Sequence, residues 1–313
     1  MHIHFPWIAS KGGLFLKKFW QKSWGYIALF SLLCFLFALA WPEPESPFLP
    51  ANGQEGVDVP VVMSHHVLEE DSSLLGDYVI SRQELESDLQ WLQKAGYTPV
   101  SPDQLIAYAA GEGELPQNPI LLTFDDGYES FFANAYPLLQ KYQMPAVVSV
   151  IGRYSDLYSQ PDAVRHLNYS HLDWDQVKTL SQSPYVSIGS HSYNMHDAAG
   201  QESRSGGKKL PGETNEHYAQ VFTTDTQKIH EAITDATGKE PTLYAYPFGF
   251  YTAQSEEILK SLGYQITLSC ESRVSRITRD PSSLFLLGRF NRPHGLSSQD
   301  FFARMQLEAT EGV

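Results

Sequence analysis

The chain has 313 residues, of which 42% are hydrophobic and 19% charged, so it holds enough apolar material for a substantial core and is not expected to be disordered throughout. Its formal net charge is −14, and because the first 42 residues contain four lysines and no acidic residue, about −18 falls on the remainder. Binding to a nucleic-acid backbone requires clustered Lys and Arg, so this balance excludes nucleic acid as a partner.

A charge-free apolar run near the N-terminus predicts a membrane segment. Residues 1–24 carry the lysines and are expected to lie in the cytoplasm, and residues 25–41 (GYIALFSLLCFLFALAW) form the run, which is near the short limit for a membrane span. The alternatives are a signal segment cleaved after Ala40, which would release a secreted protein, and a buried core helix. The long basic lead and the Trp41-Pro42 pair favour an uncleaved single-pass anchor in the cell membrane, with the rest of the chain outside.

The remainder of the chain reads as a stalk followed by one domain. Residues 42–58 are rich in Pro, Glu and Gly, which is typical of an extended extracellular segment. No internal repeat and no second linker follows, so residues 59–313 are predicted to form a single folded domain. The two cysteines are Cys34, inside the apolar run, and Cys270, so no disulfide is expected within the domain.

Apolar, β-rich runs alternate with amphipathic stretches along this domain. This pattern predicts an α/β fold in which about seven parallel strands, joined by helices, form a closed or nearly closed barrel; an open doubly wound sheet is the alternative. The expected strands are Pro60–Met63, Ile120–Phe124, Ala146–Ile151, Val186–Ser190, Leu243–Tyr246, Ile266–Leu268 and Leu284–Leu287. The expected helices are Ser81–Ala95, Ala133–Tyr142, Trp174–Ser181, Asn215–Thr237 and Ala253–Leu262.

Two adjacent carboxylates follow the strand Ile120–Phe124. Asp125 and Asp126 stand at its C-terminal end, where the active sites of barrels are built, and Gly127 permits a tight turn after them. Adjacent side chains leaving a strand point in different directions, so one carboxylate can bind a metal while the other acts as a base. Taken alone, the same residues also fit a solvated Asp-Gly turn.

Two histidines follow the strand Val186–Ser190. His191 and His196 leave the same strand end, and a loop that turns back can direct both imidazoles to one point. Two His and one carboxylate leave coordination positions open, as a catalytic metal site requires. Either histidine alone fits an ordinary polar role.

Taken together, the segments TFDDGY (123–128) and SHSYNMH (190–196) resemble the first two motifs of the polysaccharide deacetylases, the NodB-homology or carbohydrate esterase family 4 group. The resemblance spans roughly residues 60–295 and implies a distorted (β/α) barrel. It also implies that Asp125 is the general base and that Asp126, His191 and His196 bind a divalent metal, usually Zn²⁺, with Co²⁺ or Ni²⁺ as alternatives.

A third family motif, at the wall of the substrate groove, looks similar to Tyr246, Pro247, Phe248 and Gly249. A simple turn fits the same residues. Many relatives place an arginine just before this motif to steady the catalytic aspartate, and this chain has no arginine there. Arg289 and Arg273 are the candidate partners of Asp125.

The other family motifs are matched less closely. Trp174 fits either a sugar-stacking wall or a core aromatic, Tyr128 is expected to line the groove, and His294 takes the approximate place of the general acid. His65 and His66 resemble the paired histidines of the poly-β-1,6-N-acetyl-D-glucosamine N-deacetylase branch, where they would line the groove, although a surface or core role fits each of them.

These features predict a membrane-anchored, metal-dependent hydrolase that removes acetyl groups from the N-acetylated sugars of an envelope or extracellular polysaccharide. Poly-N-acetylglucosamine is favoured and peptidoglycan is next. The alternatives are an esterase acting on acetylated xylan or chitin fragments, and an inactive glycan-binding or assembly protein of the same fold. A metal-dependent peptidase on another fold would more often carry a helical H-E-x-x-H sequence, which is absent.

Overall fold

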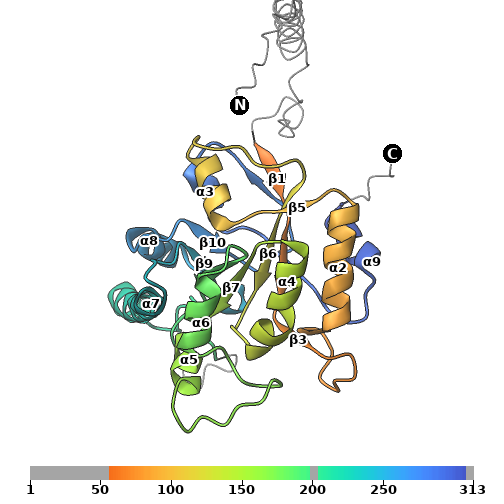
Figure 1. Cartoon of the computed structure of the whole chain (residues 1–313). Helices are drawn as coiled ribbons and strands as arrows, with labels where there is room; N and C mark the ends of the chain where they lie inside the picture. The colour runs from red at the N-terminus through yellow and green to blue at the C-terminus, as the bar shows by residue number, and fades with distance from the viewer. Residues whose placement is uncertain (1–55, 198–203, 308–313) are drawn as a thin grey trace, which may run out of the picture. The chain divides into compact units, whose positions relative to one another are not determined.

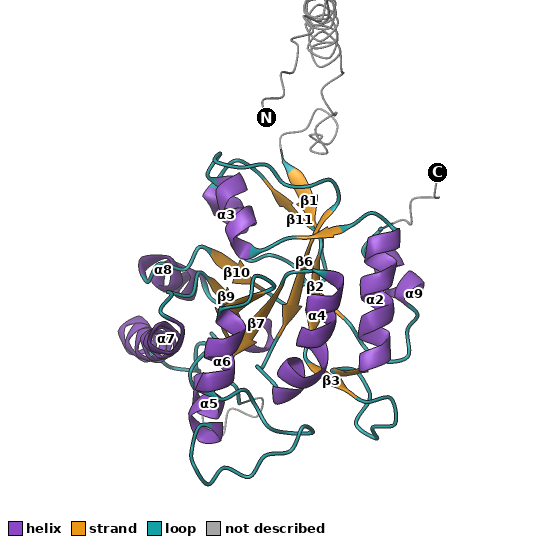
Figure 2. Ribbon diagram, in the orientation of Figure 1, coloured by secondary structure: helices purple, strands orange, loops and turns teal. Residues whose placement is uncertain are grey.

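The computed structural model describes residues 56–197 and 204–307, and a β-sheet lies at its centre (Figures 1 and 2). The strands of this parallel sheet lie in the order β10-β9-β8-β7-β6-β2-β12. This agrees with the prediction of about seven parallel strands. Along the chain the strands are β2 (Val61–Ser64), β6 (Pro119–Phe124), β7 (Ala146–Val150), β8 (Val186–Ser190), β9 (Leu243–Ala245), β10 (Ile266–Leu268) and β12 (Phe290–Asn291), and the short β5 (Thr98–Pro99) pairs with β6.

The two ends of the sheet approach each other through the segment that leads into β12. Leu287 makes a single parallel bridge to Leu268 of β10, and β12 itself pairs with β2. The predicted strand Leu284–Leu287 is therefore wrong. Pro281–Leu284 forms a 3₁₀ turn, η3, and Leu286 has a φ of 57°, which interrupts an extended chain. The barrel is distorted because so few residues close it.

Helices cover the outside of the sheet (Figure 2). Each predicted helix is present, but the one expected at Ala133–Tyr142 begins with a π-helical turn, η1 (Phe131–Ala135). Capping boxes at Ser81, Ser101, Asp173 and Thr252 define the starts of four helices. The helices are α2 (Arg82–Lys94), α3 (Pro102–Ala109), α4 (Tyr136–Tyr142), α5 (Gly152–Tyr158), α6 (Trp174–Ser181), α7 (Asn215–Thr237), α8 (Ala253–Ser261) and α9 (Ser298–Ala303).

Two small sheets flank the central one. β1 (Val57–Val59) pairs antiparallel with β11 (Ser275–Ile277), and β3 (His66–Leu68) pairs with β4 (Val79–Ser81). The strand β1 lies at the predicted start of the domain.

Strand β6 shows how the core is arranged, since all six of its residues are buried. Ile120, Leu122 and Phe124 pack in one apolar cluster with residues of the covering helices, whereas Leu121 packs in a second cluster with residues of β9 and β10. Successive side chains of a strand point to opposite faces, so β6 is almost entirely apolar because both of its faces are covered, and its one polar side chain, Thr123, donates to the carbonyl of Val62.

The predictions for residues 1–24, 25–41 and most of 42–58 lie outside the described part of the chain. Within the described part, every helix is either too short or too polar to cross a bilayer.

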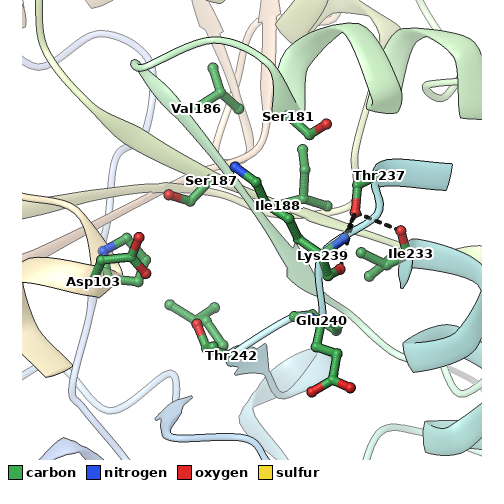
Figure 3. Close-up of a pocket in the computed structure, with 13 residues that line it drawn as sticks. Asp103, Ser181, Val186, Ser187, Ile188, Ile233, Thr237, Lys239, Glu240 and Thr242 are labelled. Carbon is green, nitrogen blue, oxygen red and sulfur yellow. Dashed lines mark hydrogen bonds between the residues drawn. The ribbon is translucent and has the colours of Figure 1, made fainter. Parts of the chain in front are cut away.

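A small cavity of about 110 Å³ lies at the N-terminal ends of β8 and β9 (Figure 3). It is lined by Ser187 and Ile188 of β8 and by Lys239 and Glu240 of the turn that leads to β9. His191 follows the opposite, C-terminal end of β8, so this cavity is separate from the residues predicted to carry the chemistry.

Candidate metal centre

The three predicted metal ligands meet at the C-terminal edge of the sheet. Asp126 follows β6, and His191 and His196 follow β8. Asp126 Oδ1 lies 3.4 Å from His191 Nε2 and 3.1 Å from His196 Nε2, and one ligand atom from each residue lies within 4.8 Å of the others. Two strands that are far apart in sequence but share the sheet thus bring the ligand set together.

Backbone conformation turns Asp126 towards the histidines. Asp126 has a φ of 67° and Gly127 a φ of 65°, so two consecutive residues adopt the left-handed conformation. A side chain at position 127 would lie 3.1 Å from the Cα of Val150, which is closer than ordinary contacts. The glycine after the two aspartates therefore permits a turn that other residues would strain.

The polar atoms at this point fit a cation. Asp126 Oδ1 is buried and has no hydrogen-bond partner. His191 Nδ1 lies 2.8 Å from the carbonyl oxygen of Ala245, so in neutral His191 the proton is on Nδ1 and the Nε2 lone pair faces the carboxylate. Lone pairs directed at one another are repulsive unless a cation lies between them, and a His₂-carboxylate set with one imidazole oriented by a backbone carbonyl is a typical divalent-metal site.

The charges around Asp126 also favour the binding of a cation. Burial opposes ionisation of Asp126, but contacts with His191 and His196 outweigh it and hold its pKa well below its ordinary value. Burial also lowers the pKa of His196, and the carboxylate of Asp126 outweighs that effect and raises it. Asp126 is thus held as an anion, the form that binds a metal.

Asp125 is paired with Arg289. Arg289 Nη1 donates to Asp125 Oδ1 over 2.8 Å, and the two residues are 0% and 2% exposed. Burial raises the pKa of Asp125, but the charges of Arg289 and His191 outweigh it and keep this pKa below the ordinary value. The other candidate, Arg273, does not reach Asp125, since it binds Glu271 and the backbone of Leu286.

The third motif is split between the site and the core. Phe248 adopts a φ of 58°, and its ring lies 4.4 Å from that of His196, so it forms a wall of the site. Gly249 is at a φ of 70° where a Cβ would lie 2.9 Å from the nitrogen of Cys270. Pro247 is buried.

Tyr246 was predicted to line the groove, and this is wrong, because the residue is 0% exposed. Its hydroxyl donates to Glu256 Oε1 over 2.8 Å, and Glu256 is itself buried. A buried carboxylate needs such a donor, so Tyr246 has a role in the core.

Stacked rings extend from the site. Tyr128 stacks on His66 with ring centroids 4.2 Å apart and on His171 with centroids 4.6 Å apart, and His171 stacks on Tyr154 at 4.4 Å. His66 is buried and its Nδ1 is 2.5 Å from Ser130 Oγ. The sequence pattern pointed to Trp174 and missed His171, three residues before it, which stacks on Tyr128.

The remaining predicted residues are more dispersed. The half-buried Trp174 begins α6, and its Nε1 donates to Asp156 over 2.8 Å. Burial lowers the pKa of His65, while the charges of Asp126 and Asp125 oppose this, so His65 lies within the field of both carboxylates. His294 binds Glu84 at the start of α2 over 2.8 Å and forms no hydrogen bond or ion pair with the three ligands or Asp125.

Comparison with known proteins gives three kinds of match. Residues 112–267 match the model of the family described as polysaccharide deacetylase. The poly-beta-1,6-N-acetyl-D-glucosamine N-deacetylase of Escherichia coli K12 is 28% identical over an alignment of 237 residues that covers 70% of this chain. The chain spans only 35% of that protein's length.

Solved structures share the fold. A de-N-acetylase from Aggregatibacter actinomycetemcomitans matches with a TM-score of 0.64 and 25% identity, covering 76% of this chain and 95% of that one. IcaB from Ammonifex degensii matches with a TM-score of 0.61 and 27% identity, covering 77% of this chain and 93% of that one. The protein described here contains a domain of the polysaccharide deacetylase family.

Proposed function

We propose that this protein is a metal-dependent N-deacetylase that removes acetyl groups from the N-acetylated sugars of an envelope or extracellular polysaccharide. One observation carries the proposal. The buried, arginine-paired Asp125 stands beside a cluster of Asp126, His191 and His196 in which the buried Asp126 Oδ1 has no hydrogen-bond partner. A base next to a cation site is the arrangement needed to activate water against an amide carbonyl.

The metal ligands would be Asp126 Oδ1 and the Nε2 atoms of His191 and His196. A divalent cation held there supplies Lewis acidity, which lowers the pKa of water and stabilises negative charge on a carbonyl oxygen. We favour Zn²⁺, with Co²⁺ and Ni²⁺ as alternatives, because two imidazoles and one carboxylate suit these ions.

The proposed reaction needs one base and one acid. Asp125, kept ionised by Arg289, accepts a proton from the attacking water. The carbon–nitrogen bond of the acetamide then breaks, acetate leaves, and the sugar nitrogen takes a proton to become an amine. His294 was the predicted proton donor. We favour His65, because its buried Nδ1 has no partner, whereas His294 is bound to Glu84. Burial lowers the pKa of His65, and the charges of Asp126 and Asp125 oppose this, so these two carboxylates would have to hold the proton on His65.

The proposed substrate is poly-β-1,6-N-acetylglucosamine, with peptidoglycan as the second choice. Support comes from the name of the E. coli relative and from the paired histidines His65 and His66. We also propose that residues 25–41 anchor the protein in the cell membrane with the deacetylase domain outside, where such polymers are found. The order of a basic flank, an apolar run and a Pro-rich segment supports this topology.

The test is acetate release by the full-length protein, purified in detergent, from poly-β-1,6-N-acetylglucosamine, peptidoglycan and acetylated xylan. Asp125→Asn, which keeps the shape of the side chain but loses the base, is the matched control. Release from the first polymer by the wild-type protein alone supports the proposal. Release from xylan alone would make the protein an esterase, and binding to a glycan without acetate release would make it a binding protein.

A further inference from the structure

A loop of four residues, 192–195, joins His191 to His196, and two helices outside the sheet hold this loop in place. Asp225, on α7, accepts two backbone hydrogen bonds from this loop. The N–H of Tyr193 donates to its Oδ1 over 2.8 Å and the N–H of Asn194 to its Oδ2 over 2.7 Å. Within the described residues, these two N–H groups donate to no other acceptor.

Helix α5 holds the opposite edge of the same loop. The N–H of Gly152 donates to the carbonyl of Ser192 over 3.2 Å, and the N–H of Arg153 donates to the carbonyl of Tyr193 over 2.9 Å. A Cβ at position 152 would lie only 2.5 Å from the ring of Tyr193, so the helix can approach this closely because it starts with glycine.

The loop needs such external support because its own conformation is unfavourable. Ser192 has a φ of 69°, an uncommon value for a residue with a side chain. One internal bond, from the N–H of Met195 to Ser192 Oγ, helps to close the turn. Contacts on both sides of the loop therefore make the imidazoles of His191 and His196 converge, although the two histidines are five residues apart in sequence.

We infer that Asp225 is a positioning residue that sets the relative placement of His191 and His196 and so controls metal affinity. The inference rests on the proposed metal site. Loss of the carboxylate would leave the N–H groups of Tyr193 and Asn194 without acceptors, and the loop would relax towards a conformation that satisfies them. His196 follows directly, so its Nε2 would move relative to those of the other ligands.

The test measures zinc affinity in the full-length protein after the metal has been removed by dialysis against a chelator. Wild type, Asp225→Ala and Asp225→Asn are compared in competition titrations with a chromogenic chelator. Asp235→Asn is the matched control, because Asp235 lies on the same helix but is exposed and forms no hydrogen bond with the loop. Thermal unfolding of the metal-free proteins is measured in parallel.

We expect Asp225→Ala to weaken zinc binding by about 10- to 100-fold, the usual effect of losing a group that orients metal ligands. The asparagine of Asp225→Asn retains one acceptor, so its loss should be smaller, and Asp235→Asn should stay within about 2-fold of wild type, as expected for a surface change. Deacetylation by Asp225→Ala should return as zinc is raised to saturation.

The outcomes separate the two claims. Equal zinc affinity of wild type and both Asp225 variants, with lower melting temperatures of the variants, would reduce Asp225 to a structural residue and overturn the inference alone. Absence of zinc binding by the wild-type protein would overturn the metal site and with it the proposed function.

Discussion

Arg289 and Asp125 are separated by 164 residues in sequence, and their side chains form a buried ion pair with an N–O distance of 2.8 Å. Arg289 Nε also donates to the carbonyl of Ser269, so the guanidinium is fixed by the backbone next to β10 as well. A buried carboxylate without such a partner would lose much of its tendency to ionise. Arg289 therefore steadies Asp125 in this chain, which lacks the arginine that many relatives carry just before the third motif.

Replacement of Arg289 by methionine is expected to lower the kcat of deacetylation by about 100-fold or more and to destabilise the fold by about 3–5 kcal/mol, because it leaves a buried charge unpaired. Steady-state kinetics and chemical denaturation would measure the two effects. The control is Arg273→Ala, whose side chain is partly exposed and bound to Glu271. Equal effects of the two substitutions would contradict the assigned partner.

Most of the site could be predicted from the sequence because it depends on local patterns. The runs that precede Asp125 and His191 have strand-like sequences, and chemistry-bearing residues at the C-terminal ends of parallel strands must meet at one edge. Interpretation failed where the pattern was ambiguous. Leu284–Leu287 is as apolar as a strand, yet only Leu287 bridges to the sheet.

Contacts between distant segments could not be predicted. The sequence offered two arginines for Asp125 and had no means to choose between them, because the choice depends on how β12 joins the sheet. Asp225 lies among other polar residues of a long helix, so nothing in the pattern marks its contact with the loop of Tyr193. Tyr246 was misplaced because a motif gives residue order but not the direction in which each side chain points.

Tyr246→Phe tests the corrected role of this residue. Loss of the hydroxyl leaves Glu256 Oε1 without its donor at 2.8 Å, so the free energy of unfolding should fall by about 1–3 kcal/mol. The KM for the polysaccharide should stay within about 2-fold of wild type, as for a residue away from the substrate. A large rise in KM with unchanged stability would instead return Tyr246 to the groove.

The two candidate proton donors can be separated by His65→Ala and His294→Ala, assayed at saturating zinc. His65→Ala should lower kcat by about 100-fold or more, the usual contribution of a general acid. His294→Ala removes a surface contact with Glu84 and should leave kcat within about 3-fold of wild type. The reverse order of the two effects would restore the acid role to His294.

Asp225 should also make the stability of the metal-free protein depend on pH. Burial raises its pKa from 3.8 to about 6, although the N–H groups of Tyr193 and Asn194 oppose this. A group whose pKa is higher in the folded state binds its proton more tightly there, so its contribution is fully present below pH 4 and is lost as pH rises through about 6.

Subtracting the unfolding free energy of Asp225→Asn from that of wild type should isolate this contribution. The difference should decrease by up to about 3 kcal/mol between pH 4 and pH 7, as a shift of this size implies. Urea denaturation at several pH values, on chelator-treated protein, provides the measurement. A difference that increased with pH would show that the folded protein lowers the pKa of Asp225.

The decisive measurement is the rate of acetate release from poly-β-1,6-N-acetylglucosamine as zinc is added to chelator-treated, full-length protein. The rate should rise in proportion to bound zinc and level off at one ion per chain, while a protein carrying both His191→Ala and His196→Ala should release no acetate at any zinc concentration. Release that is independent of zinc, or that persists in the double variant, would contradict a metal-dependent deacetylase built on Asp126, His191 and His196.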